Sequence, residues 1–305
     1  IMEILSVKSV EKSFKNKKVV KNLTFRVNKG EIMGMLGPNG AGKTTTIRMI
    51  MDIIEPDRGS INFRGNGLGP DSKKSIGYLP EERGLYEDAT TGDVLEYLGI
   101  LKGLKRRVAR DRAVKWLRKM DLGNEVDAKI SELSKGMAQK VQFIASIIHE
   151  PELAILDEPF AGLDPVNQDM FRGLIRELEE MGTTILLSSH RMNMVEELCE
   201  RVFMINRGEE VLYGKLEEIK KDFGKELVEL TYSGDPDVIS ETFGANITEL
   251  ELEEGSVRFY IEKGYSPDRF VRELPAGIEI EEISIRKPPL HDIFVAKAKG
   301  GRDEQ

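Results

Sequence analysis

The chain has 305 residues, which is long enough for two domains and a sizeable buried core. Its net charge of −8 gives no overall attraction for nucleic acid, and its single cysteine, Cys199, excludes an internal disulfide. No apolar run approaches the length of a membrane-spanning helix and no signal-peptide pattern is present, so we expect a cytoplasmic protein.

Strands are predicted in the first 36 residues. Residues 4–10 and 19–27 have strand-like composition, the basic turn 15–18 separates them, and residues 31–36 form a short apolar strand. Phe14 lies just before the turn. An isolated aromatic residue here would more often belong to the core, but the loop that follows favours a role in stacking on adenine.

That loop, GPNGAGKTT at 37–45, fits the pattern G-x-x-x-x-G-K-[ST] and precedes a predicted helix over 45–53. The order strand, glycine loop, helix is typical of a phosphate-binding loop, and an ordinary glycine-rich turn is the alternative. Backbone N–H groups can converge there on a triphosphate, and the helix dipole adds positive potential. The predicted nucleotide-binding residues are Gly37, Pro38, Asn39, Gly40, Ala41, Gly42, Lys43, Thr44 and Thr45.

Helices dominate the middle of the chain. Strands are predicted at 59–64 and 75–79, and apolar residues then recur at helical spacing over 90–122, which predicts core-facing stripes. The stretch 105–112, KRRVARDR, is either a nucleic-acid patch or a solvated helix start, and the pattern favours the helix start. Another helix is predicted within 131–150.

Two strands end in residues suited to phosphate chemistry. Residues 153–158 form an apolar run, typical of a buried parallel strand, that ends in Asp157 and Glu158, and residues 183–187 lead to His190. Because parallel strands carry their ligands at their carboxyl ends, these side chains should lie near the phosphates. Asp157 and the Thr44 hydroxyl are expected to hold Mg²⁺, and Lys43 to reach the β- and γ-phosphates. Glu158 is expected to act on the attacking water.

Beyond residue 224 the pattern changes. Strands are predicted at 227–232, 247–252, 257–261 and 278–285, helices at 237–243 and 267–274, and a last helix at 290–298. The order β-α-β-β-α-β matches a ferredoxin-like unit. Residues 226–305 hold 18 acidic and 9 basic residues, so the acidic character of the chain is concentrated there.

Over residues 2–225 these motifs resemble the ATP-binding subunits of ABC transporters. In that family Phe14 matches the adenine-stacking aromatic, 37–45 the Walker A loop and Asp157-Glu158 the Walker B acids. Residues 133–137, LSKGM, match the LSGGQ signature, Asp164 belongs to the D-loop motif AGLD at 161–164, and His190 matches the switch histidine.

The resemblance implies an α/β P-loop cassette with a mixed sheet and a helical subdomain at about 88–150, followed by a smaller α+β ferredoxin-like domain. The implied boundaries are 1–224 and 225–305. It also implies an ATPase that uses ATP and Mg²⁺ and pairs head to tail with a second ATP-binding subunit, identical or different. Ser134, Lys135 and Gly136 of one subunit would then cover the ATP of the other.

The sequence departs from the family pattern in two places. Lys135 and Met137 replace a Gly and the Gln of the signature, which adds charge at one place and removes a polar contact at the other. Glu81 stands where the family usually has a Gln, and as a carboxylate it is expected to contact metal or water rather than a bare phosphate.

The segment YLPEERGLY at 78–86 and the acidic tail resemble the branch of sodium-extrusion and antibiotic-resistance ATPases. This narrower resemblance implies an exporter, bound to the cytoplasmic face of the membrane by a separate permease and not to nucleic acid. Three alternatives remain at this point: an ABC ATPase acting on the ribosome or nucleic acid, a ligand sensor in the tail domain, and a small-molecule kinase.

Overall fold

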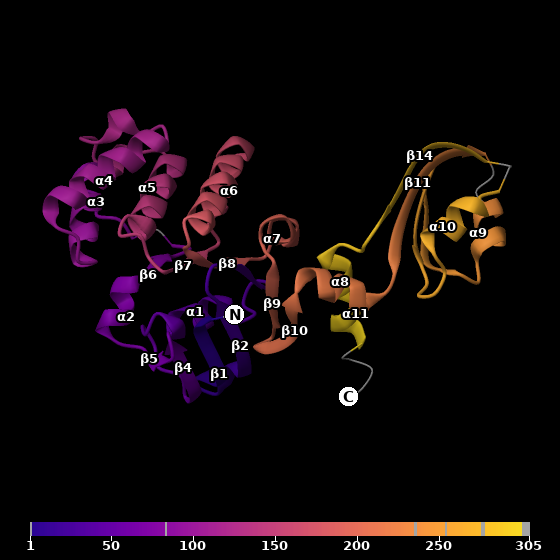
Figure 1. Ribbon diagram of the computed structural model, residues 1–305, viewed down its shortest axis with the longest axis horizontal. Helices are drawn as coiled ribbons and strands as arrows, with labels where there is room; N and C mark the ends of the chain where they lie inside the picture. Colours follow the sequence, from indigo (N-terminus) through magenta and orange to yellow (C-terminus); the bar gives the residue numbers. More distant parts are fainter. Residues whose placement is uncertain (1, 83, 235–236, 254, 276–277, 301–305) are drawn as a thin grey trace. The chain divides into compact units, whose positions relative to one another are not determined.

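The computed structural model describes residues 2–82, 84–234, 237–253, 255–275 and 278–300 (Figure 1). Arg83, within the predicted 78–86 motif, and the last five residues lie outside this part. Contacts divide the chain into two compact units, Ile1–Gly214 and Lys215–Gln305, whereas the sequence placed the boundary after residue 224. Each unit is described by itself.

No helix in the described part of the chain combines the length and the apolar character needed to cross a bilayer.

The first unit contains two sheets. In the four-stranded sheet the order is β2-β1-β4-β5, and β1 pairs antiparallel with both β2 and β4. Its strands are β1 (Glu3–Phe14), β2 (Lys17–Asn28), β4 (Arg58–Phe63) and β5 (Asn66–Gly67). The predicted strands at 4–10 and 19–27 are therefore parts of one long hairpin that turns at residues 15–16.

The six-stranded sheet carries the predicted phosphate-binding loop, residues 37–45. Its order is β10-β9-β3-β8-β7-β6, and the neighbours from β9 to β6 run parallel. Its strands are β3 (Ile32–Leu36), β6 (Ile76–Leu79), β7 (Leu153–Asp157), β8 (Thr184–Ser189), β9 (Arg201–Asn206) and β10 (Glu209–Lys215). Every residue of β3, β7 and β8 is buried, which confirms the prediction of a buried parallel strand before the two acids.

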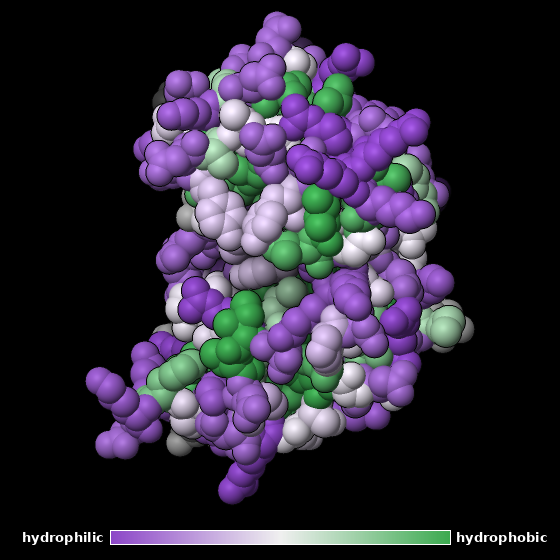
Figure 2. Space-filling view, turned by 90° about the vertical axis from the view of Figure 1, so that its left-hand side faces the viewer, coloured by the Kyte–Doolittle hydropathy of each residue, from purple (hydrophilic) through white to green (hydrophobic). Residues whose placement is uncertain are grey.

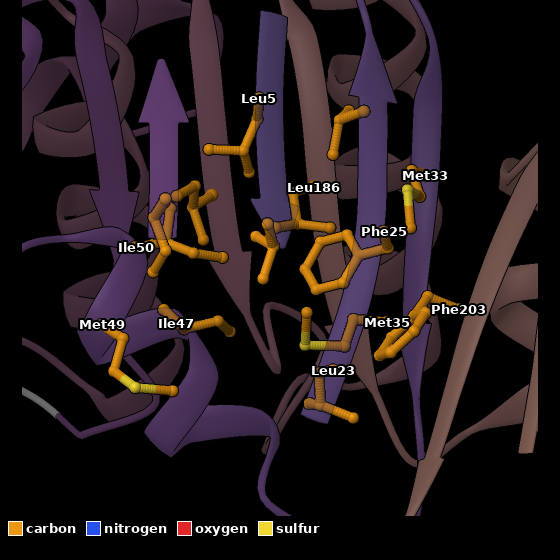
Figure 3. Packing of buried hydrophobic residues seen from close by; sticks show 14 of the residues in the cluster. Leu5, Leu23, Phe25, Met33, Met35, Ile47, Met49, Ile50, Leu186 and Phe203 are labelled. Carbon is orange, nitrogen blue, oxygen red and sulfur yellow. The ribbon is translucent and has the colours of Figure 1, made fainter. Parts of the chain in front are cut away.

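Apolar side chains from both sheets enclose helix α1 (Lys43–Ile50) in a single core (Figure 3). Leu5 and Phe25 come from the antiparallel sheet, Phe203 from the parallel one and Ile47 from the helix, and all are buried. The rings of Phe25 and Phe203 lie 4.4 Å apart between centroids. This core fixes the helix that follows the phosphate loop.

The remaining helices of this unit include a group formed by α3, α4 and α5, which contact one another. The bounds are α2 (Pro70–Ser75), α3 (Thr91–Leu101), α4 (Arg106–Lys119), α5 (Lys135–Ile147), α6 (Pro165–Glu180) and α7 (Met192–Leu198), with short 3-10 turns at Gly123–Glu125 and Ile130–Glu132.

Most of the predicted stripe over 90–122 is buried, but Leu101, predicted as core, is 57% exposed. The basic stretch begins α4, where Arg106, Arg110 and Arg112 pair with carboxylates, as expected for a solvated helix start.

The second unit has an antiparallel sheet of order β12-β13-β11-β14. Its elements are α8 (Leu216–Phe223), β11 (Glu226–Gly234), α9 (Asp237–Phe243), β12 (Ile247–Glu253), β13 (Ser256–Ile261), α10 (Pro267–Arg272), β14 (Ile278–Arg286) and α11 (Leu290–Gly300). This is the predicted β-α-β-β-α-β order. Its separate core includes Val228, Phe243, Phe259 and Phe270.

Candidate functional site

The loop between β3 and α1 has a backbone path that requires glycine. A Cβ on Gly37 would lie 2.2 Å from the carbonyl oxygen of Ile205, and Gly42 has φ +114° in the left-handed region. No side chain caps the N-terminus of α1, so its N–H groups are available to an anion. Lys43, the first helical residue, is buried, and its Nζ donates to the carbonyl of Gly37 at 2.7 Å.

A pocket of about 370 Å³ opens over this loop. Most of the predicted loop residues line it, together with two predicted acids and one residue that was not predicted. The lining residues are Val19, Asn39, Gly40, Ala41, Gly42, Lys43, Thr44, Thr45, Glu81 and Glu158. The walls therefore join backbone donors, one lysine and two carboxylates in one place.

Glu158 lies between Lys43 at the start of α1 and His190, which follows β8. Its backbone has φ +49°, and its N–H donates to the carbonyl of Ser188 at 3.1 Å, which ties it to β8. Its Oε1 lies 3.0 Å from His190 Nδ1 and 3.6 Å from Lys43 Nζ. The two partners hold a buried carboxylate at the edge of the pocket.

Asp157 is fully buried at the end of β7. Ser188 donates its hydroxyl to Oδ1, but Oδ2 is buried with no hydrogen-bond partner. Burial raises the pKa of this carboxyl, the charges of Glu81 and Glu158 add to the rise, and the hydrogen bond from Ser188 and the nearby Thr44 hydroxyl oppose it.

The described residues contain no cluster of three or more His, Cys, Asp or Glu side chains able to hold a metal. The donor set around Asp157 nevertheless fits Mg²⁺. It offers one unpaired carboxylate oxygen and the Thr44 hydroxyl, and Mg²⁺ is usually held by one or two carboxylates together with the phosphates of the substrate.

The signature residues lie elsewhere in the unit. Ser134 is the N-cap of α5, accepts from the backbone of Met137 at 3.3 Å, and is exposed together with Lys135. In the described part of the chain, neither these residues nor Gly136 lines the phosphate pocket. Asp164 is likewise exposed as the N-cap of α6, where the backbone N–H of Asn167 lowers the pKa of its carboxyl.

Phe14 ends β1 at the hairpin turn, and the residue is 46% exposed. Lys12 Nζ lies 5.8 Å from the ring centroid. Phe14 is not among the residues that line the pocket, whereas Val19 of the paired strand is. The structure thus places an unburied aromatic ring on the hairpin that contributes one wall of the pocket.

Besides Val19, sequence reasoning missed two residues that hold the acids of the site. Ser188, which donates to Asp157, lies two positions before the predicted His190, so its place at a strand end was a usable signal. Gln142 donates to backbone carbonyls beside Glu81, and as a polar residue inside a predicted helix it gave no signal.

Both parts of the chain match known protein families. The family model described as ABC transporter matches residues 20–161, and the model for the C-terminal domain of DrrA1-3-like ATP-binding proteins matches 214–298.

Among curated proteins, the uncharacterized ABC transporter ATP-binding protein YhaQ of Bacillus subtilis is 40% identical over 294 residues, covering 96% of this chain and 98% of the relative. The Nod factor export ATP-binding protein I of Rhizobium sp. is 31% identical over 295 residues, covering 95% of each. Among solved structures, one described as the ATP-binding subunit of an ABC transporter is 34% identical with a TM-score of 0.68, covering 72% of this chain and 93% of its own.

Proposed function

This chain belongs to the ABC transporter family as an ATP-binding subunit that hydrolyses ATP, and from that premise we propose that it powers export through a membrane permease on a separate chain. The observation that carries the proposal is the convergence of Lys43, Thr44 and Glu158 on one pocket beside the N-terminus of α1. The export function named for a relative that spans nearly the whole chain supports the direction of transport. It also favours transport over action on the ribosome or nucleic acid.

The chemistry follows from charge placement. Lys43 and the N–H groups of the loop would bind the β- and γ-phosphates. Glu158 would orient or deprotonate the water that attacks the γ-phosphorus in line, a role that typically contributes ~10²–10⁴-fold in rate. His190 would hold Glu158 through Nδ1 and stabilise the transferred phosphate.

Magnesium enters as a proposed cofactor of this site. When bound, Mg²⁺ would supply positive charge that neutralises the phosphates. Asp157 and Thr44 are the residues proposed to hold it, with Glu81 facing metal or water. The unpaired Oδ2 of Asp157 supports this assignment because a cation would give it a partner.

A second ATP-binding subunit, identical or different, is proposed to complete each site. Ser134 and the N–H of Gly136 would donate to the γ-phosphate held by the other subunit, with Lys135 adding positive charge and Asp164 of the D-loop nearby. The exposure of Ser134 at the start of α5, outside its own pocket, supports this arrangement. Phe14, exposed on its hairpin, is proposed to stack on the adenine.

The permease is proposed to dock on the helical region 90–150, which would place the chain on the cytoplasmic face of the membrane. Figure 2 views the first unit from the side of α3 and α4 and shows apolar side chains gathered across the middle of this face. A cleft of about 300 Å³ between α3 and the segment after β6 has mostly apolar walls, among them Leu85, Leu98 and Leu101. Exposed Tyr97 and Ile100 extend the apolar surface.

The proposal is tested by Glu158→Gln. The amide keeps the shape of the side chain and removes the base, so the variant should bind ATP, lose turnover by at least ~100-fold and accumulate as a dimer with MgATP. Turnover is measured as phosphate release and the dimer by size-exclusion chromatography. Glu180→Gln, an exposed change on α6, is the matched control and should behave as wild type. Normal steady-state hydrolysis by Glu158→Gln would refute the assignment.

A further inference from the structure

A buried amide on α5 holds the backbone beside the pocket. Gln142 is 4% exposed, and its Nε2 donates to the carbonyl of Pro80 at 3.3 Å and to that of Glu82 at 3.1 Å. Because both neighbours are acceptors, the amino group of the amide must face them. The two hydrogen bonds therefore straddle Glu81, which lines the phosphate pocket.

The segment that follows β6 has little else of this kind to fix it. In the described part of the chain, the bonds from Gln142 are the side-chain hydrogen bonds that Pro80–Glu82 receives. The Glu81 side chain is exposed and is not itself clamped by packing. Its position over the pocket therefore depends on how the backbone on either side is held.

The carbonyl oxygen of the Gln142 amide shows that burying this side chain costs folding free energy. Its Oε1 is buried and has no hydrogen-bond partner. An apolar side chain of similar volume would fill the same space without burying an unpaired acceptor. Packing alone thus disfavours glutamine at this position, and the two bonds to the Glu81 segment are what the residue supplies.

The helix that carries Gln142 begins at the signature. Ser134 caps α5, and Gln142 follows two turns later on a helix whose neighbouring residues Val141, Phe143 and Ile144 are buried. A rigid helix so placed connects the residue proposed to act on the partner's ATP with the backbone that positions Glu81 over its own.

We propose that Gln142 is a positioning residue for ATP hydrolysis, which sets Glu81 against the nucleotide by holding the carbonyls on both sides of it. This inference rests on the proposed function, since it assigns Gln142 a part in the same reaction. Gln142 acts only through Glu81 and does not touch the reacting atoms.

The first experiment compares two glutamines on one helix in the full-length chain. Gln142→Met removes the hydrogen bonds at nearly constant volume, and Gln139→Met makes the same change at a residue that is also 4% exposed and does not bond to the Glu81 segment. Gln142→Met should lower kcat roughly tenfold with the dissociation constant for ATP nearly unchanged, because misplacement affects the reacting geometry more than binding. Equal kcat values for the two variants would overturn the proposal.

A double-mutant cycle asks whether the effect passes through Glu81. Glu81→Ala should itself lower kcat, and adding Gln142→Met to it should cause little further loss, because the group being positioned is gone. Wild-type kcat in Glu81→Ala, or full additivity of the two losses, would contradict positioning.

Gln142→Glu separates the loss of the hydrogen bonds from a packing defect that methionine could introduce. A buried glutamic acid between two carbonyls regains one donor when it is protonated and repels both when it is ionised. The ratio of its kcat to that of wild type should therefore rise as pH falls, and a flat ratio would argue against the hydrogen bonds. If wild type hydrolyses ATP and the Gln142 variants have the same kcat, this inference alone is refuted. If wild type does not hydrolyse ATP, the proposed function is refuted with it.

Discussion

Asp157 is a residue whose burial suits a proposed ligand but lowers the stability of the folded protein. Its carboxyl is fully buried, Ser188 donates to Oδ1, and Oδ2 has no hydrogen-bond partner in the described structure. Burial raises its pKa above the ordinary value of 3.8. A carboxyl whose pKa is raised by folding destabilises the folded state wherever it must ionise.

Replacing this residue should therefore stabilise the protein while abolishing its activity. Asp157→Asn keeps an acceptor for Ser188 and removes the buried charge, so it should raise the free energy of unfolding by ~1–3 kcal/mol at neutral pH, without nucleotide or Mg²⁺. The cost in wild type grows as pH rises from 3.8 toward the raised pKa and is absent below 3.8, so the gain should disappear in acid. Urea titration across pH measures it, and a gain that persists in acid would contradict the argument.

The site residues that the sequence could predict are those that belong to a local pattern. Lys43, Thr44 and Glu158 stand at fixed spacings from glycines or strand ends, and the structure brings them to one pocket. Gln142 could not be found this way. Its partners are backbone carbonyls some 60 positions earlier in the chain, and neither the residue type nor its spacing predicts such a contact.

At the scale of elements, the close approach of β6 to α5 sets where the Glu81 segment begins. Gly77 in β6 lies against the carbonyl of Ser146 near the end of α5, and a Cβ on Gly77 would be 2.0 Å from that oxygen. Backbone so close to backbone cannot yield by turning a side chain. The glycine thus lets the strand and the helix pack in contact.

Gly77→Ala should force these two elements apart. We expect a loss of ~1–3 kcal/mol in the free energy of unfolding, as for other overpacked sites, together with reduced ATP turnover because the Glu81 segment follows β6 directly. Gly67→Ala in β5 is the control, since a Cβ there meets nothing within 4 Å. Thermal unfolding and phosphate release measure both effects. Equal stability in the two variants would show that the approach is not limiting.

Elements were predictable where burial imposes a period. The buried, mainly apolar strands β3 and β7 and the buried faces of α3 and α4 follow from the sequence pattern, since each must bury its apolar residues. Leu101 is an exception. It is the last residue of α3, and although it keeps the helical spacing of the apolar residues, the protein no longer buries the helix there. The exact start of α1 depends on a left-handed Gly42, which composition does not reveal.

At the scale of the whole molecule, two separate cores divide the chain. The core around α1 and the core around Phe243 and Phe259 share no residues, and the two units are each compact. The change of sequence pattern after residue 224 predicts a second domain, and contacts in the structure divide the chain ten residues earlier, after Gly214.

Two cores should unfold as two transitions. Differential scanning calorimetry of the full chain is expected to resolve a pair of peaks, because a single two-state transition is not expected of separate domains. ATP with Mg²⁺ at a hundred times its dissociation constant should stabilise the first unit by ~2.7 kcal/mol, so that its peak moves to higher temperature, and should leave the unfolding temperature of the second unit unchanged. A single peak that moves as a whole with ATP would show that the units unfold together.

The exposed position of Ser134, away from the Lys43 of its own chain, has a consequence for inheritance. If each site is completed by a neighbour, a copy damaged at Ser134 spoils a site that it does not itself carry, while its own phosphate loop still works with an intact neighbour. In a cell that makes both a sound and a faulty version of this chain, every mixed pair would then carry one spoiled site and one intact site. Where transport needs both sites, such a defect would behave as dominant, although the faulty chain folds and binds ATP normally.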